Sequence, residues 1–284
     1  MNIQISESLF LIKMLTTQSE HEPLHYIVQG EGTPVILIHG IASSLFDWKY
    51  LLPLLTQGGF RGYAPDLWGH GDSTKPDSPD EYDFDALYTH LVSWIAELNI
   101  NRPFFLIGHS LGGLLSLKYA LDWSNNIQGM VLINPFFQSN QLTPLLRLVQ
   151  TWPELGEKAL RAVPYWLIHV LTGLDLRSAA HDNTLTRTQI ADDYKRASPF
   201  IVHIAGTIPD LTICLPEIFT PSLVIWGEND LTLNPDLFPE LVEALPNARG
   251  YTIPRCGHQP HLGKPEILNW VVLDYLNQIN GSRS

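Results

Sequence analysis

A serine between glycines, directly after an apolar run, constrains this chain more than any other feature. The run Phe104 to Ile107 leads into Gly108-His109-Ser110-Leu111-Gly112-Gly113, which opens the helix-like stretch Leu111 to Tyr119. Glycines leave the room that a serine needs on a sharp turn from a strand into a helix. The pattern therefore predicts a strained turn that raises the Ser110 hydroxyl above the carboxyl edge of a sheet.

A serine nucleophile needs a base and a third group that orients the base, because its hydroxyl reacts weakly at neutral pH. G-x-S-x-G alone arises by chance in roughly one chain of this length in ten, so the partners decide the interpretation. Asp230 follows the apolar run Ser222 to Trp226, and His258 follows the run Tyr251 to Ile253. This order of serine, acid and histidine predicts a catalytic triad of Ser110, Asp230 and His258.

Five motifs in one order resemble the α/β-hydrolase superfamily, in its esterase-like branch with a helical cap. The resemblance covers the chain from about His25 to the last helix. It implies an α/β fold with a mostly parallel central sheet, helices on both faces and an inserted, mainly helical cap. The motifs are His39-Gly40 after the run Val35 to Ile38, Asp66-Leu-Trp-Gly-His70-Gly-Asp-Ser73, the serine turn, the acid Asp230, and Gly257-His258-Gln-Pro-His261-Leu-Gly-Lys-Pro-Glu266.

Three other residues compete for the roles of acid and base. Glu228 is the nearest rival acid and is expected to face solvent. Asn134 stands where some branches of the superfamily carry the acid, but an amide cannot carry the charge that steadies an imidazolium. His261 follows His258 closely and is expected to be structural or to line the pocket.

The resemblance implies an oxyanion hole made by the backbone N–H groups of Ile41 and Leu111. Preorganised donors of this kind stabilise the negative oxygen of a tetrahedral intermediate. Leu111 begins the expected helix, so its N–H has no partner within the helix and lies at the positive end of the dipole. The side chains expected to bind substrate are His39, Trp152, Trp166 and His261.

Strand-like and helix-like segments alternate along most of the chain. A strand is expected near Gly62 to Pro65, an amphipathic helix over Asp83 to Leu98, and two antiparallel strands within Met1 to Ile27. Alternation of strands with helices predicts a parallel sheet covered on both faces.

One long segment interrupts this alternation. Residues 136–220 have no clear strand pattern and contain four helix-like pieces, Pro144 to Gln150, Glu154 to Ala162, Tyr165 to Thr172 and Thr186 to Arg196. We therefore expect a core domain of residues 1–135 and 221–284, with residues 136–220 inserted as a cap over the serine.

Composition disfavours several other classes of protein. The 284 residues carry a formal charge of −12, whereas a nucleic-acid-binding protein would need a basic face. Cys214 and Cys256 are too few for a disulfide scaffold. The sequence contains no run of about 20 apolar residues, so no membrane span is expected. The N-terminus lacks the features of a signal peptide, so a cytoplasmic location is expected.

The expected partner is a small-molecule substrate, bound by a monomer or a dimer. The 11 histidines include no H-E-x-x-H motif and no close ligand grouping, so neither a metal nor a cofactor is expected.

The expected reaction is hydrolysis of a carboxylic ester with a small to medium, rather apolar acyl or alkyl group, through an acyl-enzyme intermediate. Thioesters and lactones remain open because the same chemistry serves them. Haloalkane dehalogenases and epoxide hydrolases of this superfamily use an aspartate nucleophile, so Ser110 disfavours both.

Three alternatives to an esterase remain. A C–C bond hydrolase or a menaquinone-pathway-like synthase would bind an acidic substrate through arginines of the cap. A cofactor-free haloperoxidase would closely resemble an esterase. A receptor-like member would bind a ligand with little turnover, against which the intact triad argues. The arginines available in the cap are Arg147, Arg161, Arg177, Arg187 and Arg196.

Overall fold

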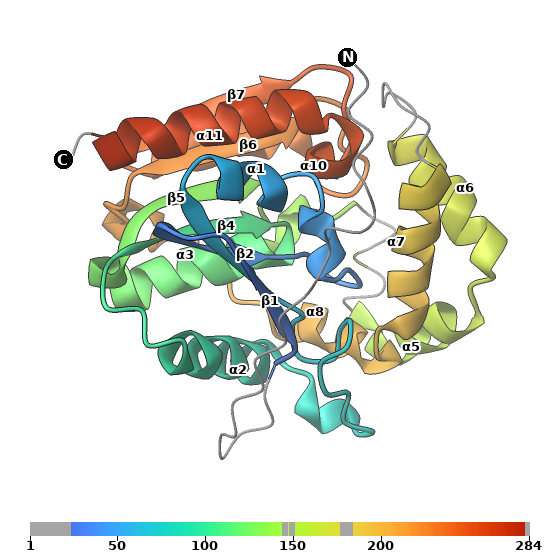
Figure 1. Cartoon of the computed structure of the whole chain (residues 1–284). Coiled ribbons are helices and arrows are strands. Elements are labelled where there is room, and N and C mark those ends of the chain that lie inside the picture. The colour runs from blue at the N-terminus through green and yellow to red at the C-terminus, as the bar shows by residue number, and fades with distance from the viewer. Residues whose placement is uncertain (1–23, 144–146, 148–150, 177–183, 282–284) are drawn as a thin grey trace.

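A central sheet of seven strands organises the chain (Figure 1). The computed structural model describes residues 24–143, 147, 151–176 and 184–281. The strand order is β1-β3-β2-β4-β5-β6-β7; β1 pairs antiparallel with β3, and all other neighbours are parallel. The strands are β1 (Tyr26–Gln29), β2 (Thr33–Ile38), β3 (Phe60–Pro65), β4 (Phe104–His109), β5 (Ile127–Ile133), β6 (Ser222–Gly227) and β7 (Ala248–Ile253).

Helices cover both faces of this sheet, as Figure 1 shows. Residues of α2 and α3 pack in the same buried cluster as Leu106 of β4, whereas residues of α1 and α11 pack with Ile107 on the opposite face. Successive residues of a strand point to opposite faces, so both faces of β4 are buried. The helices are α1 (Leu52–Gln57), α2 (Phe84–Glu97), α3 (Leu111–Trp123), α5 (Pro153–Ala162), α6 (Tyr165–Asp175), α7 (Thr184–Arg196), α8 (Ile204–Thr207), α9 (Phe238–Ala244), α10 (Pro260–Gly263) and α11 (Pro265–Gly281).

The α/β-hydrolase architecture expected from the sequence is confirmed, with a mostly parallel sheet between two layers of helices. The amphipathic stretch expected over Asp83 to Leu98 forms α2, and the Asp83 side chain caps it by accepting a hydrogen bond of 2.6 Å from Ala86 N. Of the two strands expected within Met1 to Ile27, β1 begins at Tyr26, and the residues before Leu24 lie outside the described part.

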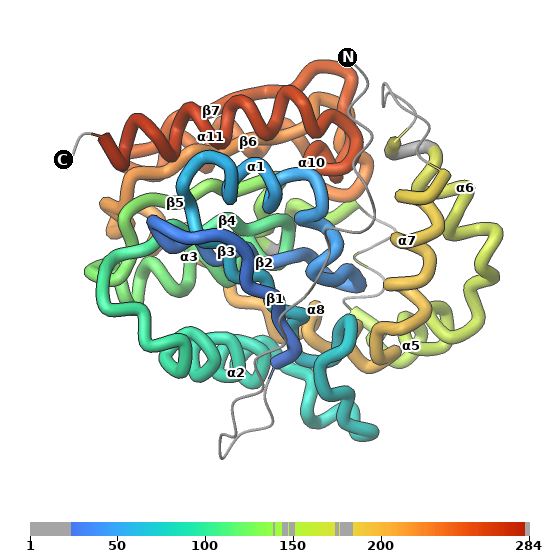
Figure 2. The backbone as a smooth tube through the Cα atoms, viewed as in Figure 1, coloured from blue at the N-terminus to red at the C-terminus, as the bar shows by residue number. Residues whose placement is uncertain are grey.

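The connection from β5 to β6 is helical and contains α5, α6, α7 and α8, with no named strand among its described residues. These helices include the stretches expected near Glu154, Tyr165 and Thr186. The stretch expected over Pro144 to Gln150 falls outside the described residues, apart from Arg147. Figure 2 shows this part of the chain to one side of the sheet, beyond the carboxyl ends of the strands.

Side chains attach this helical connection to the loops at the carboxyl ends of β2 and β3. Lys49 Nζ donates a hydrogen bond of 2.7 Å to Thr186 Oγ1. Arg196 Nη1 lies 3.0 Å from Asp72 Oδ1. Within the described ranges, no helix combines the length and the apolar character that a bilayer span requires.

The close packing of α3 against β2 gives a test of the fold. A Cβ atom on Gly112 would overlap the carbonyl group of Ile38, a main-chain group that cannot turn aside. We expect Gly112→Ala to lower the free energy of unfolding by about 1–3 kcal/mol, as measured by urea denaturation. Gly281→Ala is the matched control, because a Cβ atom there meets open space. Equal stability of the two variants would contradict this packing.

Candidate active site

Ser110 lies on a strained turn between β4 and α3. Its φ of 51° is unusual for a residue with a side chain. Main-chain hydrogen bonds hold the turn: Ser110 N donates to Ile133 O over 3.0 Å, while the Ser110 carbonyl accepts from Gly113 N at 2.9 Å, from Phe136 N at 3.0 Å and from Leu114 N at 3.3 Å. Gly108 lies so close to Gly112 that a Cβ atom would overlap its carbonyl. The glycines thus permit the turn, and the neighbouring strand secures it.

Asp230 and His258 form a buried hydrogen-bonded pair at the same edge of the sheet. Asp230 follows β6, His258 follows β7, and Asp230 Oδ2 lies 2.7 Å from His258 Nδ1. Asp230 Oδ1 accepts hydrogen bonds from the backbone N–H groups of Thr232 at 2.7 Å and Leu233 at 3.0 Å. The carboxylate is therefore fixed in orientation, and it fixes the imidazole ring in turn.

The environment of Asp230 keeps its carboxylate ionised. Burial by itself raises the pKa, but the charge and hydrogen bond of His258, the N–H of Leu233 and the amide of Asn134 together hold the pKa below its ordinary value. An ionised carboxylate stabilises the imidazolium that forms when a histidine accepts a proton.

Asn134 supports the acid, a role that the sequence analysis missed. It follows β5, is fully buried, and its Nδ2 donates a hydrogen bond of 2.7 Å to Asp230 Oδ2. Its φ is 41°, and its backbone N donates to Ile225 O at 2.8 Å. The adjacency of β5 and β6 in the sheet is the signal that pairs the two residues, because neighbouring parallel strands present their carboxyl ends side by side.

His109 connects the serine turn with the histidine loop. It directly precedes Ser110, and its Nε2–H donates a hydrogen bond of 3.0 Å to the carbonyl of His258. The two imidazole rings lie 4.9 Å apart, centroid to centroid. The residue before the serine therefore holds the main chain of the histidine.

The loop after β2 lies against the serine. A Cβ atom on Gly40 would be 3.2 Å from Ser110 Cβ, so the backbone of Gly40, next to Ile41, lies close to Ser110. Leu111 is the first residue of α3, where a backbone N–H has no acceptor within the helix. Both expected oxyanion donors thus belong to segments that border Ser110.

His39 is buried, and both of its ring nitrogens bind backbone groups. Nδ1–H donates to the Gly40 carbonyl over 2.7 Å, and Nε2 accepts from Leu67 N over 2.9 Å. The ring therefore holds the loop after β2 to the loop after β3.

The other side chains expected to bind substrate lie in two different places. His261 is buried behind the serine turn, with its ring 4.4 Å from that of His109. Trp152 and Trp166 lie in the helical connection, where 54% and 66% of their surfaces are exposed. The structure thus brings His261, but not the two tryptophans, into a buried cluster with residues of the site.

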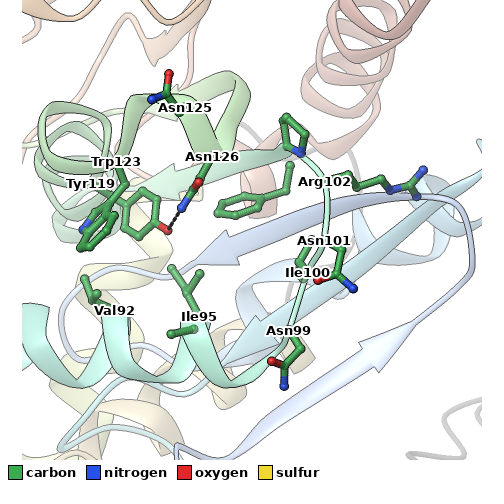
Figure 3. A pocket seen from close by; sticks show the side chains of 13 residues that line it. Val92, Ile95, Asn99, Ile100, Asn101, Arg102, Tyr119, Trp123, Asn125 and Asn126 are labelled. Atoms are coloured by element: carbon green, nitrogen blue, oxygen red, sulfur yellow. Dashed lines mark hydrogen bonds between the residues drawn. The ribbon is translucent and has the colours of Figure 1, made fainter.

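A cavity of about 360 Å³ lies at the amino ends of β4 and β5, and Figure 3 shows the side chains that line it. Asn101 and Arg102 line it ahead of β4, and Asn125 and Asn126 line it ahead of β5. These residues lie at the edge of the sheet opposite Ser110, so the cavity is separate from the cluster of expected catalytic residues.

Buried His70 gives a test of the pH dependence of stability. Burial lowers its pKa from 6.5 to about 3. Because the folded pKa lies below the unfolded one, the neutral ring contributes stability that is fully present above about pH 6.5 and is lost as the pH falls toward 3. Between pH 6.5 and pH 4, the free energy of unfolding should fall by up to about 1.4 kcal/mol for each pH unit.

We expect His70→Gln to reduce that slope, as measured by urea denaturation at a series of pH values. His169→Gln is the control, because His169 is only partly buried. An unchanged slope in His70→Gln would contradict the assignment of a neutral, buried ring.

Comparison with known proteins assigns the chain to a family. The profile described as alpha/beta hydrolase fold matches residues 33–265. Bifunctional epoxide hydrolase 2 of Sus scrofa is 25% identical over 89% of this chain and 53% of its own length, so the chain spans about half of that relative. The 2-hydroxy-6-oxo-6-(2'-aminophenyl)hexa-2,4-dienoic acid hydrolase of Metapseudomonas resinovorans is 25% identical over 89% of this chain and 87% of its own length.

Solved structures agree with this assignment at the level of the fold. A thermophilic esterase from Thermogutta terrifontis has a TM-score of 0.75 and 22% identity, with 90% of this chain and 93% of that one covered. The enol-lactonase from Burkholderia xenovorans has a TM-score of 0.74 and 23% identity, with 89% and 96% covered. With a family profile that matches most of its length, the chain belongs to the α/β-hydrolase fold family.

Proposed function

We propose that the protein is a serine hydrolase that cleaves carboxylic esters with the triad Ser110, His258 and Asp230. The hydrogen bond of 2.7 Å between Asp230 and His258 supports this proposal most directly, because His109, the residue before Ser110 on the strained turn, binds the His258 carbonyl at 3.0 Å. A carboxylate that orients an imidazole next to an activated hydroxyl is the arrangement that acyl transfer requires.

In the proposed reaction, Ser110 Oγ attacks the ester carbonyl while His258 accepts the hydroxyl proton. The tetrahedral intermediate places its negative oxygen between the backbone N–H groups of Ile41 and Leu111. His258 then protonates the leaving alcohol, and an acyl-enzyme remains on Ser110. Water then attacks the acyl carbonyl while His258 accepts a proton from it, and His258 returns this proton to Ser110 Oγ as the acid is released.

The identity of the nucleophile separates this chain from the activities named for several relatives. The matched relatives include epoxide hydrolases and a haloalkane dehalogenase. Enzymes of those two kinds in this superfamily use an aspartate nucleophile, whereas this turn carries Ser110. A serine hydroxyl is suited to attack at a carbonyl carbon, which favours esters, thioesters or lactones as substrates.

We further propose that residues 136–220 form a cap over a core of residues 1–135 and 221–284. The position of α5 to α7 beyond the carboxyl ends of the strands supports this division (Figure 1).

A C–C bond hydrolase is the second candidate, because the relative from Metapseudomonas resinovorans carries such a name and is matched over most of its length. An acidic substrate would need arginines of the cap. Arg161 pairs with Glu157 at 3.1 Å, and Arg196 pairs with Asp193 at 2.9 Å. Arg147 donates to the Leu142 carbonyl at 2.9 Å. These three guanidinium groups already have partners within the chain, which favours a neutral ester. Arg187 Nε, by contrast, is buried without a hydrogen-bond partner among the described residues, so Arg187 is the arginine that would serve an acidic substrate.

The proposal is tested with p-nitrophenyl esters from acetate to palmitate. We expect turnover with an optimum of chain length, and a loss of at least about 10³-fold in kcat for Ser110→Ala, because triad residues act as a unit. A fluorophosphonate probe should label the wild type and leave Ser110→Ala unlabelled.

Ser124→Ala is the control, because Ser124 is an exposed serine at the far end of α3. It should match the wild type in turnover and labelling. Retention of activity in Ser110→Ala would overturn the mechanism. Absence of both turnover and labelling in the wild type would overturn the function.

A further inference from the structure

A second group of buried titratable residues lies directly behind the proposed triad. Asp47 belongs to the 3-10 helix Leu45–Trp48 that follows the loop after β2, His109 ends β4, and His261 lies in α10. All three side chains are buried, at 1–3% exposure. The proposed triad does not use their chemistry, so their burial calls for another explanation.

The Asp47 carboxylate faces both imidazole rings. Its Oδ2 lies 3.6 Å from His109 Nδ1 and 3.5 Å from His261 Nε2. Its Oδ1 accepts a hydrogen bond of 2.5 Å from Ser43 Oγ. Among the described residues, Asp47 Oδ2, His109 Nδ1 and His261 Nε2 have no hydrogen-bond partner. The contacts between the carboxylate and the two rings are therefore electrostatic and are not hydrogen bonds.

A buried carboxylate of this kind needs polar partners, since an isolated charge inside a protein is costly. Burial by itself raises the pKa of Asp47, but the neighbouring imidazoles of His261 and His109 hold it well below its ordinary value. Burial lowers the pKa of His109 to about 4. The two rings that face Asp47 are therefore the groups that accommodate its carboxylate in the interior.

The other titratable groups around Asp47 already have partners. Asp193 of α7 faces the same region and pairs with Arg196 at 2.9 Å. His258 is hydrogen-bonded to Asp230 at 2.7 Å. His109 and His261 are therefore the rings that face the Asp47 carboxylate.

We propose that the buried contact between Asp47 and His261 positions His258, with His109 as the connection to the His258 main chain. His261 lies three residues after His258, so the pair fixes the histidine loop against the segment that follows Ile41. His109 binds the His258 carbonyl at 3.0 Å and lies beside Asp47. The Asp47 carboxylate thus faces His109, which directly precedes Ser110, and His261, which follows His258 in the same loop region. This inference rests on the proposed function.

The kinetic test uses Asp47→Asn, His261→Gln and the double variant with a p-nitrophenyl ester. We expect each single variant to lower kcat by about 10- to 100-fold, because a misplacement of about 1 Å has effects of that size. KM should change by less than about twofold, because neither residue contacts substrate. The double variant should lose about as much as a single one, since two members of one pair do not act additively.

His25→Gln is the matched control. It breaks another aspartate–histidine pair, in which His25 Nδ1 lies 2.8 Å from Asp66 Oδ2, without a contact to the histidine loop. We expect it to lower the melting temperature by an amount similar to that of His261→Gln while kcat stays within about twofold of the wild type. A fall in kcat for His25→Gln as large as that for His261→Gln would reduce the pair to a general structural role and overturn the proposal.

A spectroscopic measurement judges the positioning without substrate. The Nδ1 proton of His258 in its hydrogen bond to Asp230 should give a low-field proton resonance, assigned by its loss in Asp230→Asn. We expect it to broaden or disappear in Asp47→Asn and His261→Gln and to persist in His25→Gln. An unchanged resonance together with unchanged kcat would overturn the proposal, even where the wild type hydrolyses the ester.

Failure of the proposed function is distinguishable from failure of this inference. A wild type that reacts with neither ester nor fluorophosphonate refutes the function, whereas the resonance still reports whether the pair holds His258. Metal analysis of the purified protein completes the test. A stoichiometric divalent cation that is lost in His261→Gln would replace the contact between Asp47 and His261 with a metal site and overturn the proposal.

Discussion

The turn at Ser110 is the constraint on which the rest of the site depends. It joins β4, the middle strand of the sheet, to α3 with a φ of 51°. Such a conformation costs about 1–3 kcal/mol and persists only where the surroundings hold it. Hydrogen bonds to Ile133, Gly113 and Phe136 supply that hold, and Gly108 and Gly112 let the strand and helix approach. The strain is thus balanced by the packing of the central layer.

Electrostatics organises the same edge of the sheet. Asp230 faces His258, Asp47 faces His261, and Asp66 faces His25, all at the carboxyl ends of strands or in the loops that follow them. Each pair joins segments that are far apart in the chain. Buried ion pairs are weak sources of stability, but breaking one leaves an unpaired charge. Their value here is orientation, because groups that meet a developing charge must be fixed in advance.

The family assignment and the chemistry rest on different observations. The profile match and the sheet topology establish the fold, which hosts many reactions. The relatives named as epoxide hydrolases and as a dienoic acid hydrolase show how widely those reactions range. Within this chain, the residue on the turn and its neighbours carry the proposal of ester cleavage. The nature of the substrate depends on the helical connection, in which Arg147, Arg161 and Arg196 are engaged with other groups and Arg187 Nε is buried without a hydrogen-bond partner among the described residues.

The sequence by itself determined the strand-turn-helix at Ser110 and the alternation that builds a parallel sheet, because both depend on local patterns of glycine and apolar residues. The order of Ser110, Asp230 and His258 also follows from the chain alone. Only the tertiary structure decided that Asn134 supports Asp230, that Asp47 faces His109 and His261, and that Trp152 and Trp166 are exposed. Those contacts join residues far apart in sequence, and the neighbours in a sheet arise from strand order rather than from any local pattern.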